Sequence, residues 1–452
     1  MDAALFAQLL IYGLTDGAVV ALNAVGFSLA YSVARQINLA HGSVFALTTV
    51  VVANLASFTG ATTAAPLPLR VLWLLLFALA GAAFGAILNA AIERLAFKPF
   101  RAVKDPLAPL IASVALSFVL MQAAVWWHDL RFVAPPGAHQ GVDLPLLAMP
   151  DLIPRLELGP AGVSFTLKDL LVLTIAALVA LGGAAWLARS RTGRLLRAVA
   201  QDPETTMLMG GDPARANLVA FAVGGAVAGF GAAIFAAYFG GANAQYGLRS
   251  GLAAMTAAVL GGVGDPRGAL LGGIVLGIVS SFSDYLLDAQ WTPVLVLLLL
   301  VALLAFRPSG LLGTTSVATD LEAATRPVLA AVRGSRLSRR VLVVLFAVGA
   351  LYPLVGYLTG SVALAGVTNA LVMVTLAIGL TLVVGFAGLL DLGYAAFFAI
   401  GAYTAAVLTS SGSRIAMLLP EVARNPLLGL AMAGLVAAGF GVLVGLPSVR
   451  TR

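Results

Sequence analysis

Long runs without a charged residue constrain this chain more than any other feature. Residues 17–34, 71–92 and 289–306 contain no Asp, Glu, Lys or Arg, and residues 341–413 contain only Asp391. About 20 apolar residues in a helix cross the core of a bilayer. Charged residues make up 10% of the chain, against about 25% in soluble domains, so the apolar surface exceeds what a soluble fold of this size can bury. The sequence therefore predicts an all-α polytopic membrane protein and excludes soluble, disordered and disulfide-stabilised classes.

The uncharged runs divide into about 13 membrane segments. They are expected near 5–32, 40–58, 70–92, 107–127, 168–188, 214–238, 250–264, 268–287, 291–306, 341–359, 363–386, 391–410 and 427–447. Two of these segments, 40–58 and 250–264, are short and interrupted by glycine, so we expect broken or re-entrant helices there. The N-terminus lacks a basic region and a cleavage site, which favours a retained span over a signal peptide.

Basic clusters between the spans predict the orientation. Arginines and lysines gather at 94–104, 189–215 and 326–340, and the positive-inside rule places all three clusters in the cytoplasm. The loop 128–169 is then outside, and so is the N-terminus. The net charge of +7 is explained by this orientation and does not indicate a nucleic-acid partner.

Segments 24–46 and 377–399 resemble each other at a constant offset of 353 positions, at which Gly26 corresponds to Gly379. The predicted topology inserts both copies in the same direction. This is a parallel repeat, unlike the inverted repeat of many ion-coupled carriers. The simplest account is two permease units joined by a linker over 307–340, and chance similarity between apolar helices is the alternative.

Each copy contains a polar, helix-breaking element at the same place. Asn38, His41 and Gly42 interrupt the first copy, and Asp391, Gly393 and Tyr394 interrupt the second. Polar, irregular backbone within a membrane lines a cavity or is enclosed by protein. We therefore treat these residues as candidates for a translocation pathway. The candidates are Asn38, His41, Gly42, Asp391, Gly393, Tyr394 and Phe398.

Other interpretations of these residues stay open. Asn38 and Asp391 also suit the N-cap of the helix that follows, and His41 suits a hydrogen-bonded structural role. As a lone intramembrane carboxylate, Asp391 is in addition a candidate proton or ion site, which is what an ion-coupled secondary transporter would require.

The charged loop 189–215 is expected to form one short amphipathic helix between two spans. Asp202-Pro203-Glu204 is typical of a cap followed by a first helical turn, and Gly210-Gly-Asp-Pro ends the helix. Such a helix either rests on lipid headgroups or docks a soluble partner.

No motif in the sequence predicts catalysis. The chain has three histidines and no cysteine, and neither a metalloprotease helix nor a nucleophile elbow is present. Gly261-Gly-Val-Gly-Asp-Pro is rich in glycine but is not followed by Lys-Ser/Thr, so it predicts a tight turn. We expect no enzyme activity, no catalytic residue and no metal site.

Four motifs resemble the first permease subunit of branched-chain amino acid ABC importers: INLAHG (37–42), RAVAQDPETTMLMGGDPARA (197–216), AVLGGVGDPRGALLGG (258–273) and FRPSGLLG (306–313). Residues 377–408 resemble the second subunit, although Tyr394 stands where that subunit often has histidine. The resemblance implies a first unit over 1–313, a cytoplasmic linker over 314–340 and the start of a second unit over 341–452. By the repeat offset, Arg452 corresponds to residue 99, so we expect the second unit to be incomplete.

The resemblance also implies the partners. Two cytoplasmic ABC ATPase subunits would bind ATP and Mg²⁺, a periplasmic or lipid-anchored binding protein would deliver the amino acid, and the chain itself would bind no cofactor. The expected location is the lipid bilayer of the bacterial inner membrane, with transport by alternating access. The loop 197–216 matches the coupling element of the family, which assigns ATPase coupling to Arg197, Ala200, Gln201, Asp202 and Gly210. Urea or short amides are the alternative substrates, while a passive channel or a secondary carrier is the alternative mechanism.

Overall fold

The structure is a computed structural model of the chain. It describes residues 2–102, 107–128, 147–313 (without 155, 160–162, 244–245 and 308), 351, 363–382, 394–413 (without 411), 417 and 425–450. These residues belong to two compact units, Met1–Ala324 and Thr325–Arg452, each of which is described here by itself.

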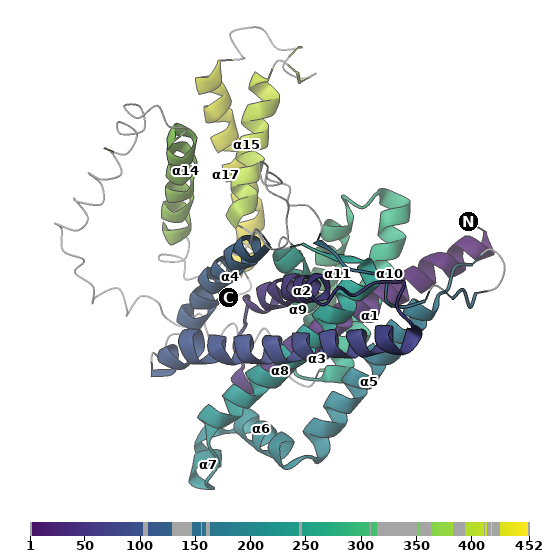
Figure 1. Ribbon diagram of the computed structural model, residues 1–452. Helices are drawn as coiled ribbons and strands as arrows, with labels where there is room; N and C mark the ends of the chain where they lie inside the picture. The colour runs from purple at the N-terminus through teal and green to yellow at the C-terminus, as the bar shows by residue number, and fades with distance from the viewer. Residues whose placement is uncertain are drawn as a thin grey trace. The chain divides into compact units, whose positions relative to one another are not determined.

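The first unit is a bundle of apolar helices (Figure 1). Its α-helices are α1 (Ala3–Ala34), α2 (His41–Phe58), α3 (Leu67–Ile92), α4 (Leu107–His128), α5 (Leu167–Arg189), α6 (Arg191–Gln201), α7 (Pro203–Leu208), α8 (Pro213–Phe239), α9 (Tyr246–Gly261), α10 (Pro266–Leu287) and α11 (Thr292–Phe306). A π-helical turn, η1 (Glu93–Phe97), and a 3-10 turn, η2 (Lys98–Ala102), extend α3. Two short strands, β1 (Leu147–Ala148) and β2 (Gly241–Ala242), pair antiparallel.

The second unit contributes α14 (Ala363–Leu382), α15 (Tyr394–Thr409) and α17 (Pro426–Arg450). Helices α15 and α17 pack against each other. Gly429 of α17 lies so close to α15 that a Cβ there would approach Thr409 Cγ2 to 2.7 Å.

Most predicted spans are confirmed as helices. Among the described residues, eight helices are long and apolar enough to cross a membrane, and α11, α14 and α15 include shorter apolar stretches. The predicted span 250–264 corresponds to the 16-residue α9, and the predicted span 341–359 lies almost wholly outside the described residues. The expected break within 40–58 is wrong, because α2 is one continuous helix and the irregular backbone precedes it.

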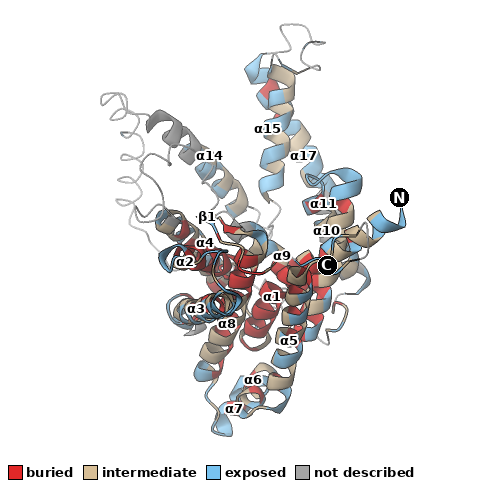
Figure 2. Cartoon of the chain, turned by 45° about the vertical axis from the view of Figure 1, so that its right-hand side comes forward, coloured by how far each residue is buried: buried red, intermediate tan, exposed pale blue. Residues whose placement is uncertain are grey.

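Helix α2 lies at the centre of the first unit. It contacts α3, α4, α8 and α9. In addition, 78% of its residues are buried, a larger share than in the apolar stretch of any other candidate span of the described chain. Buried residues concentrate along α1, α2, α8 and α9, while α3 and α5 expose much of their surface (Figure 2). The outer helices thus present apolar side chains to lipid, and α2 is enclosed by protein.

Glycines allow the helices of this unit to touch backbone to backbone. A Cβ on Gly17 of α1 would lie 2.7 Å from the carbonyl oxygen of Gly273 in α10. Helices α3 and α8 meet in the same way at Gly85 and Gly225, where an added Cβ would lie 2.3 Å from the facing carbonyl oxygen. In lipid there is no hydrophobic driving force between helices, so their association depends on van der Waals contact. Small residues at the contact allow the backbones to approach closely enough for it.

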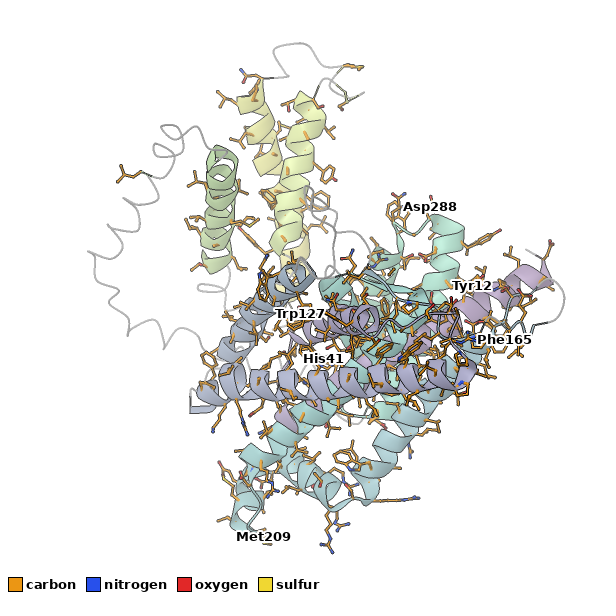
Figure 3. All side chains as sticks on the ribbon, viewed as in Figure 1. Tyr12, His41, Trp127, Phe165, Met209 and Asp288 are labelled. Carbon is orange, nitrogen blue, oxygen red and sulfur yellow. The ribbon has the colours of Figure 1, made fainter. Side chains whose placement is uncertain are left out.

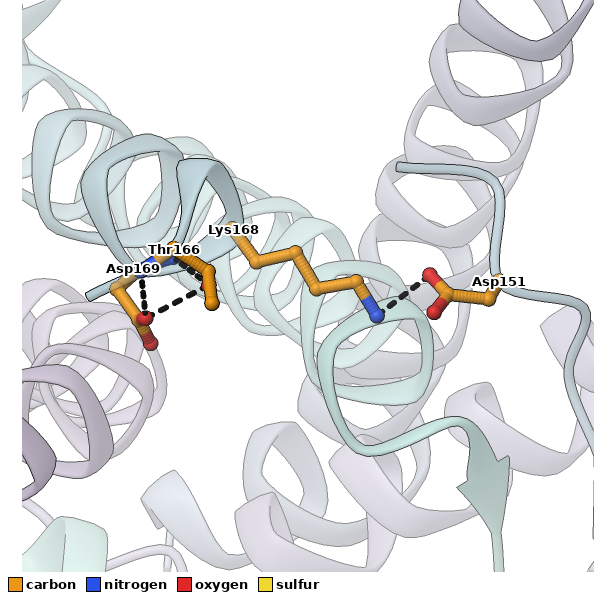
Figure 4. A network of polar contacts seen from close by, with 4 residues as sticks. All are labelled: Asp151, Thr166, Lys168 and Asp169. Atoms are coloured by element: carbon orange, nitrogen blue, oxygen red, sulfur yellow. Dashed lines mark hydrogen bonds and ion pairs between the residues drawn. The ribbon is translucent and has the colours of Figure 1, made fainter. Parts of the chain in front are cut away.

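The start of α5 is fixed by a cluster of polar contacts (Figure 4). Lys168 forms an ion pair of 2.5 Å with Asp151. The Thr166 side chain accepts the N–H of Asp169, and the Asp169 carboxylate accepts the N–H of Thr166 in return, which is a capping box. The same carboxylate accepts the hydroxyl of Tyr238 from α8 at 2.7 Å. These contacts tie the loop after β1 to both α5 and α8.

The predicted tight turn between α9 and α10 is present and is clasped by a distant segment. Gly262 and Gly264 have φ of 108° and 96°, which only glycine adopts readily. The N–H groups of Leu311 and Leu312 donate to the carbonyl oxygens of Leu260 and Gly261. Residues 309–313 and the α9–α10 turn therefore form one substructure.

A first test concerns the glycine contacts. Replacing Gly17 with Ala places a methyl group against the α10 backbone, so we expect a loss of about 1–3 kcal/mol in the free energy of unfolding. The measurement is thermal unfolding of the purified protein in detergent. The matched control is Gly182→Ala in α5, where an added Cβ meets nothing within 4 Å. Equal stability of the two variants would contradict the close α1–α10 packing.

Candidate functional site

The charged loop between α5 and α8 contains two helices: α7, which lies between the predicted cap at Asp202 and the predicted end at Gly210, and α6, which was not predicted. Helix α6 ends at Gln201, Asp202 adopts an extended conformation, and α7 begins at Pro203. Proline has no N–H to continue the hydrogen-bond ladder of a helix and suits the first helical position. The two helices form an arm beyond the ends of α5 and α8 (Figure 1).

Helix α6 is packed firmly on the bundle. Leu196 and Val199 are buried in the same apolar cluster as Val33 of α1 and Ala216 of α8. The Arg197 guanidinium donates to the carbonyl oxygen of Ala188 at 3.0 Å and so satisfies a free carbonyl near the end of α5. Since α6 contacts α1, α5 and α8, a displacement of α6 acts on all three helices.

Helix α7 depends on the Asp202 carboxylate. Asp202 Oδ1 accepts the N–H groups of Glu204 and Thr205 at 3.0 Å each, and Oδ2 accepts the Thr205 hydroxyl. The hydroxyl of Thr205, its N–H and the N–H of Glu204 together hold the pKa of the Asp202 carboxyl below its usual value. The predicted cap is therefore confirmed, and the carboxylate stays ionised at neutral pH.

The far end of the arm is apolar and exposed. Met207, Leu208 and Met209 are 55%, 88% and 85% exposed, and we call these three residues the α7 tip. Met209 is labelled at the end of the arm in Figure 3. Gly210 follows with φ of 83°, so the chain can reverse toward α8. Three consecutive exposed apolar residues on a capped, short helix form a protruding contact surface.

The structure separates the five predicted coupling residues by role. Three of them shape the arm: Arg197 bonds to the end of α5, Asp202 caps α7, and Gly210 allows the chain to turn back toward α8. All three residues are exposed. Gln201 is exposed and Ala200 is half-buried on α6. The α7 tip itself was not predicted as a contact surface. Its signal in the sequence was the run Met-Leu-Met directly before two glycines.

The polar break of the first copy is held by side chains from two other helices, α3 and α4. Asn38 donates to Asn89 Oδ1 of α3 at 3.3 Å, and Asn89 donates to the carbonyl oxygen of Phe221 in α8 at 2.7 Å. Ser113 Oγ of α4 accepts the N–H of Leu39 at 3.2 Å. Asn38 is not the N-cap of α2, a position that Ala40 occupies, but Asn38 Oδ1 accepts the N–H of Ala40. The N–H groups of Leu39 and Ala40 in the irregular backbone are thereby satisfied by protein side chains.

His41 and Gly42 lie at the junction of α1, α2 and α9. His41 Nε2 lies 3.3 Å from the carbonyl oxygen of Asn23 in α1. The ring of His41 packs edge-on against Phe27 with 5.9 Å between centroids. Gly42 faces Gly251 of α9, where an added Cβ would lie 2.9 Å from Gly42 Cα. Asn38, His41 and Gly42 are all buried in the first unit.

In the second unit, Tyr394, which the repeat offset pairs with His41, lies in α15. The hydroxyl of Tyr394 packs against the backbone of α14 at Gly379, the residue that corresponds to Gly26. Phe398 is 44% exposed. Asp391 and Gly393 lie outside the described residues, so their predicted role stays a prediction.

One carboxylate within a predicted span was missed in the sequence. Asp16 lies within α1, inside the first predicted span. Its signal was a single acidic residue inside the first predicted span. Within the described part of the chain, no three His, Cys, Asp or Glu side chains are grouped so that they could hold a metal ion.

The chain matches one protein family over most of its length. The model of the family described as branched-chain amino acid transport system / permease component matches residues 9–304 and again residues 362–452. Both copies of the repeat, 24–46 and 377–399, thus lie within ranges that the same family model matches. No solved structure matches the chain.

Several relatives share this similarity. The high-affinity branched-chain amino acid transport system permease protein BraD of Pseudomonas aeruginosa is 32% identical over 316 residues, which cover 69% of this chain and 97% of BraD. LivH of Escherichia coli is 30% identical over 317 residues, with the same coverage. LivM of Salmonella typhimurium is 37% identical over 127 residues, which are 28% of this chain and 27% of LivM. The chain belongs to the family of branched-chain amino acid transport permeases.

Proposed function

We propose that this chain is the membrane permease of an ATP-driven importer for branched-chain amino acids in the bacterial inner membrane. Relatives named as permeases of branched-chain amino acid transport cover 69% of the chain at 30–32% identity. In this proposal two cytoplasmic ABC ATPases bind ATP and Mg²⁺, and a periplasmic or lipid-anchored binding protein delivers the substrate. Urea and short amides are the alternative substrates, and no observation favours them.

The α7 tip is proposed as the surface that docks on the ATPases, and its exposure is the observation that carries this proposal. Met207, Leu208 and Met209 project apolar surface beyond a helix that its own Asp202 cap stabilises. An amphipathic helix lying on lipid headgroups would instead expose arginines around a buried apolar face. In α6 that apolar face is already occupied by the bundle, through Leu196 and Val199.

The arm offers a mechanical connection from the tip to the spans. Movement of the tip acts on α6 through the short link at Asp202, and α6 contacts the ends of α1, α5 and α8. ATP-driven closure of the ATPases would therefore shift these helices together, which is what alternating access requires. Asn38, His41, Gly42, Asp391, Gly393, Tyr394 and Phe398 remain proposed pathway residues. The first three are buried within the first unit.

A second test addresses the tip. We expect Leu208→Glu to reduce co-purification with the ATPases and amino acid import at least tenfold, because a charge replaces the most exposed apolar side chain of the tip. The matched control is Phe58→Glu at the end of α2, which is 69% exposed and lies at the predicted outer end of its span, so it is expected to leave ATPase docking unchanged. Undiminished assembly of a normally inserted Leu208→Glu protein would refute docking through the tip.

A third test separates the cap from direct contact at Asp202. Asp202→Ser retains a side chain that accepts the N–H groups of Glu204 and Thr205, whereas Asp202→Ala does not. We expect near-normal ATPase assembly for Ser and a clear loss for Ala. The readout is the amount of ATPase bound per permease. Equal losses for both variants would show that the carboxylate itself contacts the partner.

A fourth test addresses substrate and energy source. In proteoliposomes containing the chain, both ATPases, any further permease subunit and the binding protein, uptake of labelled leucine is expected to require ATP. Excess isoleucine or valine should inhibit uptake, and excess urea should not. Uptake without ATP, or inhibition by urea alone, would contradict the proposal.

A further inference from the structure

Four exposed arginines gather at the end of α5 that the topology predicts to be cytoplasmic. Arg189 ends α5, Arg191, Arg194 and Arg197 follow on α6, and we call these four residues the arginine cluster. The Arg194 guanidinium donates to the carbonyl oxygen of Arg189 at 3.3 Å, and that of Arg197 donates to the carbonyl oxygen of Ala188 at 3.0 Å. Two side chains of α6 are thus held against the last residues of α5 (Figure 1).

The positive charge of the cluster is not neutralised by the described part of the chain. The sequence has no Asp or Glu between Asp169 and Asp202, and none of the four arginines forms an ion pair with a described carboxylate. The Asp202 carboxylate is already engaged in the cap of α7. Because a guanidinium has five N–H donors and each hydrogen bond above uses one, most donors of the cluster remain available to an anion.

The length of α5 places the cluster at the level of the lipid headgroups. Helix α5 has 23 residues, which extend over about 34 Å at the rise of an α-helix. The hydrocarbon core of a bilayer is about 30 Å thick. With the capped start of α5 at one interface, Arg189 lies at the other, where arginine side chains reach the headgroups.

An exposed apolar stripe of α5 leads to the cluster. Leu170, Leu178 and Leu181 are 43%, 65% and 53% exposed. At 3.6 residues per turn they share one face of the helix with Ala188, which is also exposed. The carbonyl oxygen of Ala188 is the one that Arg197 binds. An acyl chain that lies along this stripe therefore has its headgroup beside the arginines.

We propose that the arginine cluster binds the phosphate of an anionic phospholipid of the cytoplasmic leaflet, whose acyl chains lie along α5. Guanidinium groups match phosphate oxygens in charge and geometry, and anionic lipids attract basic residues next to a span. The apolar face of α6 is packed on the bundle through Leu196 and Val199, so the headgroup is bound by charge, without insertion of α6 into the bilayer. Lipid binding here depends neither on the substrate nor on ATPase docking at the α7 tip.

The bound headgroup also stabilises the contact between α5 and α6. Like charges that lie close together repel each other, and an anion between them removes this repulsion. Since α6 additionally contacts α1 and α8, a lipid at the cluster holds the base of the arm against the bundle.

The test is native mass spectrometry of the full chain in detergent, titrated with phosphatidylglycerol or with phosphatidylcholine of the same acyl chains. We expect the chain to bind phosphatidylglycerol at least tenfold more tightly than phosphatidylcholine. Arg191→Gln with Arg194→Gln should reduce phosphatidylglycerol binding at least fivefold and leave phosphatidylcholine binding unchanged. Arg191→Lys with Arg194→Lys keeps the charge and should retain most of the binding. Arg197, a proposed coupling residue, stays intact in all variants.

The matched control is Arg94→Gln with Lys98→Gln, which removes the same charge from exposed residues at the predicted cytoplasmic end of α3. It should leave phosphatidylglycerol binding unchanged. Equal losses in the two Gln pairs would indicate attraction by overall charge and would overturn the site, as would equal binding of the two lipids by the parent chain. Excess glycerol 3-phosphate should not displace the lipid, and displacement would show a site for soluble phosphate instead.

Thermal unfolding gives an independent measurement. Phosphatidylglycerol in the detergent should raise the Tm of the parent chain more than that of the Arg191→Gln, Arg194→Gln variant, because only the parent gains the bound headgroup between α5 and α6. Equal shifts of the two proteins would overturn the proposed site.

Discussion

Backbone contact between helices is the interaction on which the first unit depends. In lipid, apolar side chains gain little by leaving one apolar environment for another, so packing at close range must hold the helices together. Glycines at the α1–α10 and α3–α8 crossings allow this, since the facing backbones leave no room for a Cβ. Large apolar side chains consequently point outward, as Leu72, Leu79 and Ile87 of α3 do.

The same environment governs the polar groups. A backbone that leaves the helical conformation inside a membrane must find partners within the protein. At the break before α2 these partners are Asn89, Ser113 and the Asn38 side chain itself, supplied by α3, α4 and the break. The polar residues that looked like a pathway in the sequence are thus, in the first unit, also the residues that allow α2 to begin in the centre of the bundle.

Hydropathy was sufficient to predict most of the apolar helices, because length and absence of charge are local properties that each helix carries by itself. Local chemistry was also sufficient for the cap at Asp202 and for the tight turn at Gly262 and Gly264. The signals at Asp202-Pro203-Glu204 and at Gly210 correspond to the two ends of α7, but they left α6 unpredicted, so one helix was expected where the structure has two. The exposure of the α7 tip depends on which residues of α6 the bundle buries, and no local pattern specifies that. Asn89 is similar, because its partners Asn38 and Phe221 are 51 and 132 positions away.

The clasp at the α9–α10 turn makes two remote stretches of sequence into one structural element. A Cβ on Gly262 would lie 2.2 Å from the nitrogen of Gly313, and a Cβ on Gly310 would lie 2.7 Å from Gly262. Neither stretch can acquire a larger side chain at these glycines unless the other moves away. Mutational tolerance at residues 309–313 is therefore set by a turn some fifty positions earlier, and the chain that leaves α11 is anchored at its first bend.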